Sequence, residues 1–194
     1  MAEQNFWASP TVEPKRAYRW ILNIGEVPIW ICKKVTKPNF TITETPHKYL
    51  NHTFYYPGRV EWDKVSVTLV DPVQPDSAKL MWNILTKSGY RLHGDGDPSP
   101  HVNDTTTISK QNAISSLGGV ILRQLGAEDD SYVEEWKLHN AWVSSVKFGE
   151  LSYESEELLN VDIEIRYDWA TIKGGELNNK GGTGAATRTD NNAL

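Results

Sequence analysis

Residues 161–170 read VDIEIRYDWA, and their side chains alternate without a break between apolar and charged. The apolar or aromatic set is Val161, Ile163, Ile165, Tyr167 and Trp169, and the charged set is Asp162, Glu164, Arg166 and Asp168. Successive side chains of an extended strand point to opposite faces. The stretch therefore predicts a strand whose apolar face meets a core while its charged face points away from that core.

A second stretch with a period of two, residues 62–70, precedes the clearest change of period in the chain. From position 65 on, every other residue is valine or leucine, which predicts a strand with one buried face. Prolines then interrupt the strand, and apolar residues recur every three or four positions until Gly89. This spacing, with Asp76 or Ser77 as the capping residue, predicts a helix over about 75–88.

The other segments are mostly typical of strands. A hairpin is predicted from 18–24 and 27–35, and further strands at 39–45, 53–56, 120–125, 132–139 and 158–167. Prolines 46 and 57 directly follow the short strand candidates 39–45 and 53–56 and indicate that each ends there. Segment 142–151 is ambiguous. Residues 92–106 predict a polar loop, and 109–117 are compatible with a second short helix. We therefore expect a mainly β fold in which two packed antiparallel sheets form a sandwich or small barrel, flanked by the helix over 75–88.

Composition divides the chain of 194 residues into three parts. Residues 1–15 predict an irregular arm, 16–170 a single β-rich domain, and 171–194 a flexible tail rich in glycine and asparagine. The formal net charge is -5, and the tail holds three basic and two acidic residues, so the rest of the chain is more acidic than the whole. An acidic surface repels phosphate backbones, which argues against a nucleic-acid-binding surface.

The sequence contains no targeting, membrane or redox signal. No apolar run approaches the roughly 18 residues of a membrane span, and the polar start lacks the order of a signal peptide. We expect synthesis in the host cytoplasm and no membrane partner. The single cysteine, Cys32, excludes an internal disulfide and predicts a buried, inert thiol.

Motifs that would indicate catalysis are missing. The chain has no HExxH, GxSxG or phosphate-binding glycine loop, so we expect no enzyme and no cofactor. The patch HGDGDPSPH at 93–101 offers His93, Asp95, Asp97 and His101 as metal ligands, but it fails the calcium-loop pattern and is also typical of an exposed loop. A metal-dependent enzyme stays an alternative. Another is a carbohydrate-binding β-sandwich that stacks sugars on Trp7, Trp30, Trp62 or Trp142.

The order of several segments resembles a known family. WICKKVTKP (30–38) precedes PGRVEWDKVSVTLVD (57–71), then the capped helix, then NVDIEIRYDWA (160–170). Across 18–169 this resembles the tail tube proteins of contractile-tailed bacteriophages. The resemblance implies a tube fold related to the haemolysin-coregulated tubes of type VI secretion. It also implies a structural virion protein whose hexameric rings stack into a tube inside a contractile sheath and conduct DNA during ejection, with a largely acidic inner wall.

The resemblance also implies partners and surfaces. The partners would be further copies of the chain, the tail sheath protein, the baseplate and tail terminator proteins and a tape measure protein in the lumen, with viral DNA passing without specific binding. Strands 62–70 and 161–169 would contribute to the sheet that joins neighbouring subunits, while a baseplate-proximal tube initiator of the same fold stays an alternative role. The expected channel-facing or intersubunit residues are Asp162, Glu164, Arg166 and Asp168. The residues expected in loops that contact the next ring or the sheath are Tyr55, Tyr56, Arg59, His93, Asp95 and Asp97.

Overall fold

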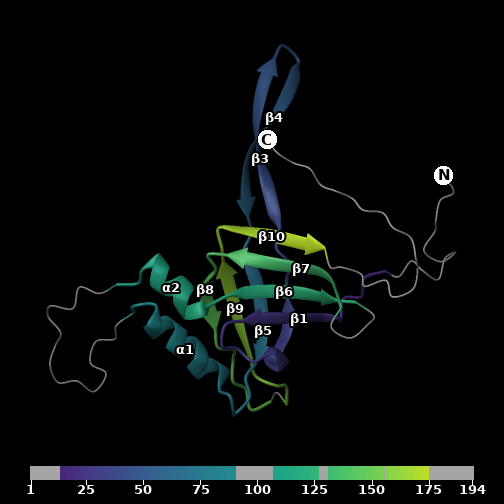
Figure 1. Ribbon diagram of the computed structural model, residues 1–194. Coiled ribbons are helices and arrows are strands. Elements are labelled where there is room, and N and C mark those ends of the chain that lie inside the picture. Colours follow the sequence, from purple (N-terminus) through teal and green to yellow (C-terminus); the bar gives the residue numbers. More distant parts are fainter. Residues whose placement is uncertain (1–13, 91–106, 127–130, 155, 175–194) are drawn as a thin grey trace, which may run out of the picture.

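The computed structural model describes residues 14–90, 107–126, 131–154 and 156–174. Within these residues two four-stranded antiparallel sheets pack face to face, and a long two-stranded hairpin projects away from them (Figure 1). The sheets are packed together without closing into a barrel, so the sandwich form of the predicted mainly β fold is confirmed.

The two sheets, called sheet A and sheet B here, mix strands from both halves of the chain. Sheet A has the order β1 (Trp20–Ile24), β6 (Val120–Leu125), β7 (Tyr132–His139) and β10 (Trp169–Gly174). Sheet B has the order β2 (Cys32–Val35), β5 (Val65–Val70), β9 (Asn160–Arg166) and β8 (Trp142–Lys147). The hairpin consists of β3 (Phe40–Tyr49) and β4 (His52–Trp62).

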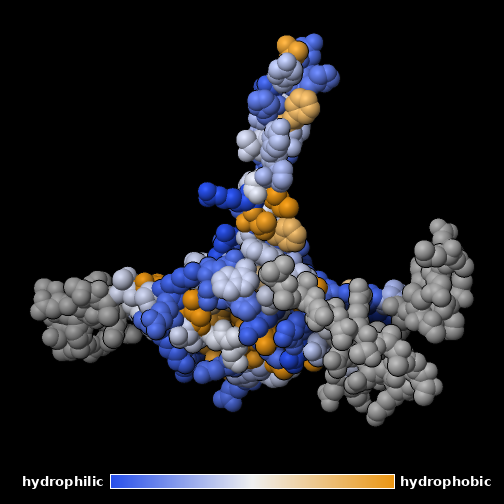
Figure 2. All heavy atoms as spheres, turned by 45° about the horizontal axis from the view of Figure 1, so that its top comes forward, coloured by the Kyte–Doolittle hydropathy of each residue, from blue (hydrophilic) through white to orange (hydrophobic). Residues whose placement is uncertain are grey.

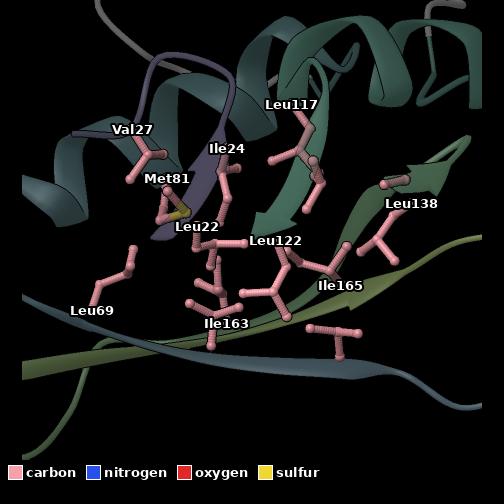
Figure 3. Packing of buried hydrophobic residues seen from close by; sticks show 14 of the residues in the cluster. Leu22, Ile24, Val27, Leu69, Met81, Leu117, Leu122, Leu138, Ile163 and Ile165 are labelled. Carbon is pink, nitrogen blue, oxygen red and sulfur yellow. The ribbon is translucent and has the colours of Figure 1, made fainter. Parts of the chain in front are cut away.

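The core lies between the facing sheets. In sheet B, β5 places Val67 opposite Ile163 of β9, and both side chains are fully buried. Leu22 and Leu122 approach them from sheet A, and Met81 closes one side from a helix (Figure 3). The predicted alternation of 161–167 is therefore confirmed, because its apolar positions are all buried in this cluster.

Both predicted helices are present and begin at polar caps. Helix α1 (Ser77–Lys87) follows Asp76, whose carboxylate accepts a hydrogen bond of 2.8 Å from the Lys79 amide. Helix α2 (Lys110–Leu117) follows Ser109, whose hydroxyl accepts one of 3.2 Å from the Asn112 amide. The two helices contact each other, and α2 also contacts β8. Together they cover one end of the sandwich (Figure 1).

The hairpin predicted from 18–24 and 27–35 is wrong. Strand β1 pairs with β6 of sheet A, whereas β2 pairs with β5 of sheet B. Gly25, at a φ of 41°, starts the reversal, and the 3-10 helix η1 (Ile29–Ile31) leads the chain to the second sheet. A Cβ at Gly25 would lie 2.1 Å from the Leu117 carbonyl oxygen, so this crossing requires glycine.

The two short strands predicted around the prolines are wrong in length. They form one continuous hairpin, in which Pro46 lies opposite Tyr55 and Pro57 opposite Glu44. Proline cannot donate to a ladder, but the hairpin has only two strands, so each proline can face outward at an unpaired edge. Tyr55, Tyr56 and Arg59, expected in contact loops, thus lie in strand β4.

Other boundaries differ from expectation. Strand β5 begins at Val65, and Trp62 instead ends β4. The ambiguous segment 142–151 contains β8, and β9 is followed by a further strand, β10, that continues four residues past the expected domain end at 170. Between β9 and β10 the Asp168 amide donates a hydrogen bond of 3.0 Å to the His139 carbonyl, which ties this connection to the end of β7.

Candidate assembly surfaces

The projecting hairpin presents a large apolar surface. Its members, called the hairpin surface, are all more than half exposed: Phe40, Ile42, Tyr49, Leu50, Phe54, Tyr55, Tyr56 and Val60. Figure 2 shows apolar side chains along the hairpin, with a group where it leaves the body of the protein. The register puts them on both faces of the hairpin, with Tyr55 opposite in direction to Phe54 and Tyr56. So many exposed apolar side chains on one projecting element indicate an interaction site. Tyr55 and Tyr56, predicted as contact residues, belong to it.

A bulge shapes the middle of the hairpin. The register shifts between Ile42 and Glu44, and the Thr43 hydroxyl there accepts a hydrogen bond of 2.8 Å from the Arg59 amide. A Cβ at Gly58 would lie 2.4 Å from that hydroxyl oxygen, so the strands can approach this closely only at glycine. Arg59, the third predicted contact residue in this region, thus helps to fix the hairpin through its backbone.

A buried carboxylate ties the hairpin base to sheet A. Glu134 of β7 is only 5% exposed. It accepts hydrogen bonds from the Lys37 ammonium, at 2.9 Å, and from Lys15 and the Trp136 indole. Burial alone would raise the pKa of Glu134, but these donors lower it to about 2. Lys37 also donates to Gln124 at 2.7 Å, so the start of the hairpin and residue 15 are both fixed to one point of sheet A.

Three of the four predicted charged residues lie on one face. Asp162, Glu164 and Arg166 project from the side of sheet B that points away from the core, called the polar face here. Asp162 accepts a hydrogen bond of 2.6 Å from the Thr68 hydroxyl. Glu164 accepts one of 2.9 Å from Lys64, and this contact holds the pKa of Glu164 below its usual range.

Asp168 lies apart from this set. Its carboxylate accepts hydrogen bonds of 2.7 Å from the Lys110 ammonium and 2.7 Å from the Asn140 amide. These donors, Lys110 foremost, lower the pKa of Asp168. The residue therefore joins α2 to the turn before β10.

The polar face is more basic than acidic. Alongside Asp162 and Glu164, the described part of the face has five basic residues: Lys33, Lys34, Lys64, Lys147 and Arg166. The largely acidic inner wall that the resemblance implies is therefore not found on the face that bears the predicted channel residues. A count of net charge over the whole chain could not reveal this, because it does not say which strands share a face.

A pocket of about 740 Å³ lies where the hairpin base, α2 and the end of β9 meet. Trp62 and Trp142 line it, whereas Trp30 is exposed on η1 and Trp7 lies outside the described residues. The Tyr167 hydroxyl is buried there and lacks a hydrogen-bond partner among the described residues. Burial, and then the charge of Asp63, raise the pKa of Tyr167 to about 12. Of the three described tryptophans considered for sugar stacking, Trp62 and Trp142 thus share this pocket, whereas Trp30 does not line it.

The remaining predicted site residues fall outside what can be described. His93, Asp95, Asp97 and His101 lie outside the described residues. In the described ranges, no group of three or more His, Cys, Asp or Glu side chains could hold a metal ion. None of the helices in these ranges is long and apolar enough to cross a membrane. Cys32 is half-buried, and burial raises the pKa of its thiol to about 11.

Sequence reasoning missed the Glu134 cluster and the length of the hairpin. A signal for the first was present: Trp136 and Leu138 point inward, so a period of two places Glu134 inward as well. A signal for the second was the aromatic run TFYY beside prolines, since a strand that tolerates proline has a free edge.

Solved structures with this fold come from contractile injection systems. A chain in the cryo-EM structure of the anti-feeding prophage baseplate, symmetrised six-fold, matches with a TM-score of 0.58 and 14% identity, covering 85% of this chain and 99% of its own. A chain in the PVC sheath/tube terminator structure, from an extracellular contractile injection system, matches with a TM-score of 0.58 and 12% identity. The match covers 84% of this chain and 98% of that one. A chain in the PVC sheath-tube complex matches with a TM-score of 0.56 and 12% identity, covering 83% of this chain and 92% of that one.

The chain therefore has the tube-type fold of contractile injection systems, as the resemblance implied. At 12–14% identity these matches define the fold alone. A comparison with protein-family models finds no match, and neither does one with curated protein sequences.

Proposed function

We propose that the protein is a structural tube subunit of a contractile particle and acts by self-assembly rather than catalysis. The observation that carries this proposal is the hairpin surface: a set of exposed apolar side chains on a projecting hairpin of a tube-type fold, which no described part of the chain covers. Eight exposed apolar side chains on one hairpin are unfavourable in water, and a neighbouring copy is the partner that a tube supplies.

In the proposed assembly, six copies form a ring and rings stack through the hairpins. A six-fold arrangement is supported by the symmetrised baseplate structure that contains a chain of this fold. A projection from one ring would cover apolar surface on the next, and Tyr55, Tyr56 and Arg59 would lie at that contact. Residues 92–106, with His93, Asp95 and Asp97, lie outside the described residues and would contact the sheath or the next ring.

The polar face would line the channel of this tube. Lumen walls contact water, and most outward side chains of sheet B are charged or hydroxylated, which supports this placement. Asp162, Glu164 and Arg166 would face the lumen, whereas Asp168 would stabilise the subunit itself. A tail sheath, a baseplate, a terminator and a tape measure protein would be the further partners, and passage of viral DNA through the tube of a virion stays a prediction of the resemblance.

Electron microscopy of the purified protein tests the proposal. The wild-type chain should form rings and stacked tubes. The variant Leu50→Asp with Phe54→Asp should form rings without long tubes, because two charges on the hairpin surface would be desolvated in each stack. Val73→Asp, at a fully exposed position off the hairpin, is the matched control and should stack normally. Tubes of wild-type length from the hairpin variant would refute the stacking role, and the absence of any assembly would refute the function.

A second role, the baseplate-proximal tube initiator, is favoured by one observation: one of the matched chains comes from a baseplate structure. A tube subunit must greatly outnumber a single starter ring. Quantitative mass spectrometry of intact particles, with a baseplate protein as the reference, separates the two roles by copy number.

A further inference from the structure

Within the described part of the chain, sheet B has two unpaired edges, and they differ in chemistry. Among the described residues its order is β2-β5-β9-β8. Strands β5 and β9, expected to contribute to the sheet that joins neighbours, lie in its interior, and β2 and β8 form its edges. Beside β2, a groove of about 580 Å³ opens between the first strands of the two sheets. This groove, called the edge groove, has Trp20 and Ile29 in its apolar wall and the exposed Lys33 and Lys34 at its rim.

The opposite edge is followed by an unusual connection. Residues 148–159, FGELSYESEELL, join β8 to β9 and are called the acidic segment here. Among their described residues, Leu151 is 85% exposed, Leu158 is 69% exposed and Tyr153 is fully exposed. Glu150 and Glu154 are exposed beside them. The segment is therefore both acidic and apolar, and the described residues of the chain leave Leu151, Tyr153 and Leu158 largely uncovered.

The two features lie at the same end of sheet B. Asn160, which follows the acidic segment, pairs with Val70, while Cys32, in the wall of the edge groove, pairs with Leu69 one position away. They are separated by the width of the sheet, about 14 Å for three strand spacings. A rotation that brings the β8 edge of one copy to the β2 edge of the next thus places the segment and the groove at the same height.

We propose that the acidic segment of one copy occupies the edge groove of the next, and that this contact is the head-to-tail interface of the ring. Glu150 and Glu154 meet Lys33 and Lys34, while the apolar side chains of the segment cover the groove wall. An interface between two different surfaces of the same chain closes into a ring when its rotation does. The inference rests on the proposed ring and names its subunit contact.

A mixing experiment tests the pairing. Variant G, Lys33→Glu with Lys34→Glu, disables the groove; variant S, Leu151→Asp with Tyr153→Asp, disables the segment at exposed positions. Alone, each should be monomeric by sedimentation velocity, with self-association weakened at least about tenfold. Mixed in equal amounts they should form dimers and nothing larger, because only the segment of G and the groove of S remain compatible. Dimer formation also shows that both variants are folded.

The other outcomes are equally informative. Rings from G or S alone would overturn this interface while leaving the proposed tube function intact. Two monomeric variants that fail to pair on mixing would also overturn it, because a segment that docks within its own chain gains nothing from mixing. A wild-type chain that stays monomeric would overturn both proposals. Leu50→Asp on the hairpin surface is the control, and it should assemble into rings like the wild type.

Discussion

The substitution Glu134→Gln should destabilise the protein in a way that depends on pH. The amide keeps the shape of the side chain and an acceptor for the Trp136 indole, but it removes the charge that Lys15 and Lys37 face. Displacement of the carboxyl pKa from 4.5 to about 2 corresponds to about 3 kcal/mol of folding free energy. Both lysines are about half exposed, so screening by water reduces the expected loss at pH 7 to roughly 1–3 kcal/mol.

The sign of the pH dependence follows from the direction of the displacement. Because the folded-state pKa of Glu134 is the lower one, its contribution is fully present above the unfolded value of 4.5 and is lost as the pH falls towards 2. More than half of the difference between wild type and variant should therefore disappear by pH 3. Other carboxylates titrate in both proteins and cancel in the comparison.

Urea unfolding followed by tryptophan fluorescence, at one fixed protein concentration, measures this difference at pH 7 and pH 3. The reasoning fails if the variant is as stable as the wild type at pH 7. It also fails if a difference seen at pH 7 has the same size at pH 3, since that loss would come from packing rather than from the ionised carboxylate.

Three further substitutions test other parts of the structure. Ile163→Asp should cost several kcal/mol of folding free energy and prevent folding, because the side chain is fully buried. The control Ser66→Ala, on the polar face, should leave the midpoint of thermal unfolding almost unchanged. Equal midpoints for the two variants would mean that the faces are reversed. Gly58→Ala should disturb the hairpin alone, because the added Cβ would collide with Thr43. Hydrogen exchange should show faster amide exchange confined to residues 40–62. Unchanged exchange rates would contradict the close approach of the two strands. Asp76→Ala should lower the unfolding free energy by about 1 kcal/mol through loss of the α1 cap, and chemical denaturation that finds no change would exclude the capping role.

The elements with a strong local period were predictable from the sequence. The predicted bounds of β6 and β7 match those of the structure, and helix α1 lies within its predicted range. The alternation over 161–167 correctly separated a buried face from an exposed one, whereas Trp169, expected on the buried face, is 45% exposed in β10. Each of these features depends on neighbouring residues, since side-chain direction follows from a period of 2 or 3.6 within one element.

Pairing partners were not predictable in the same way. Residues 18–24 and 27–35 have the pattern of a hairpin, yet the close approach of Gly25 to the end of α2 sends them to different sheets. The prolines at 46 and 57 suggested breaks, and only the isolation of the hairpin from other strands explains their presence inside it. Which edges are free is a property of the whole sheet and leaves no periodic signal in one segment.

The candidate surfaces show the same division. The sequence by itself determined that Asp162, Glu164 and Arg166 share a face, because they are two residues apart in one strand. Only the tertiary structure decided that lysines from β2, β8 and the start of β5 surround these three residues, and that Asp168 turns away to contact α2. It also decided that an acidic segment and a basic groove lie on opposite edges of one sheet. The physical reason is that charges act through space, and residues brought together across strands can be more than one hundred positions apart in the chain.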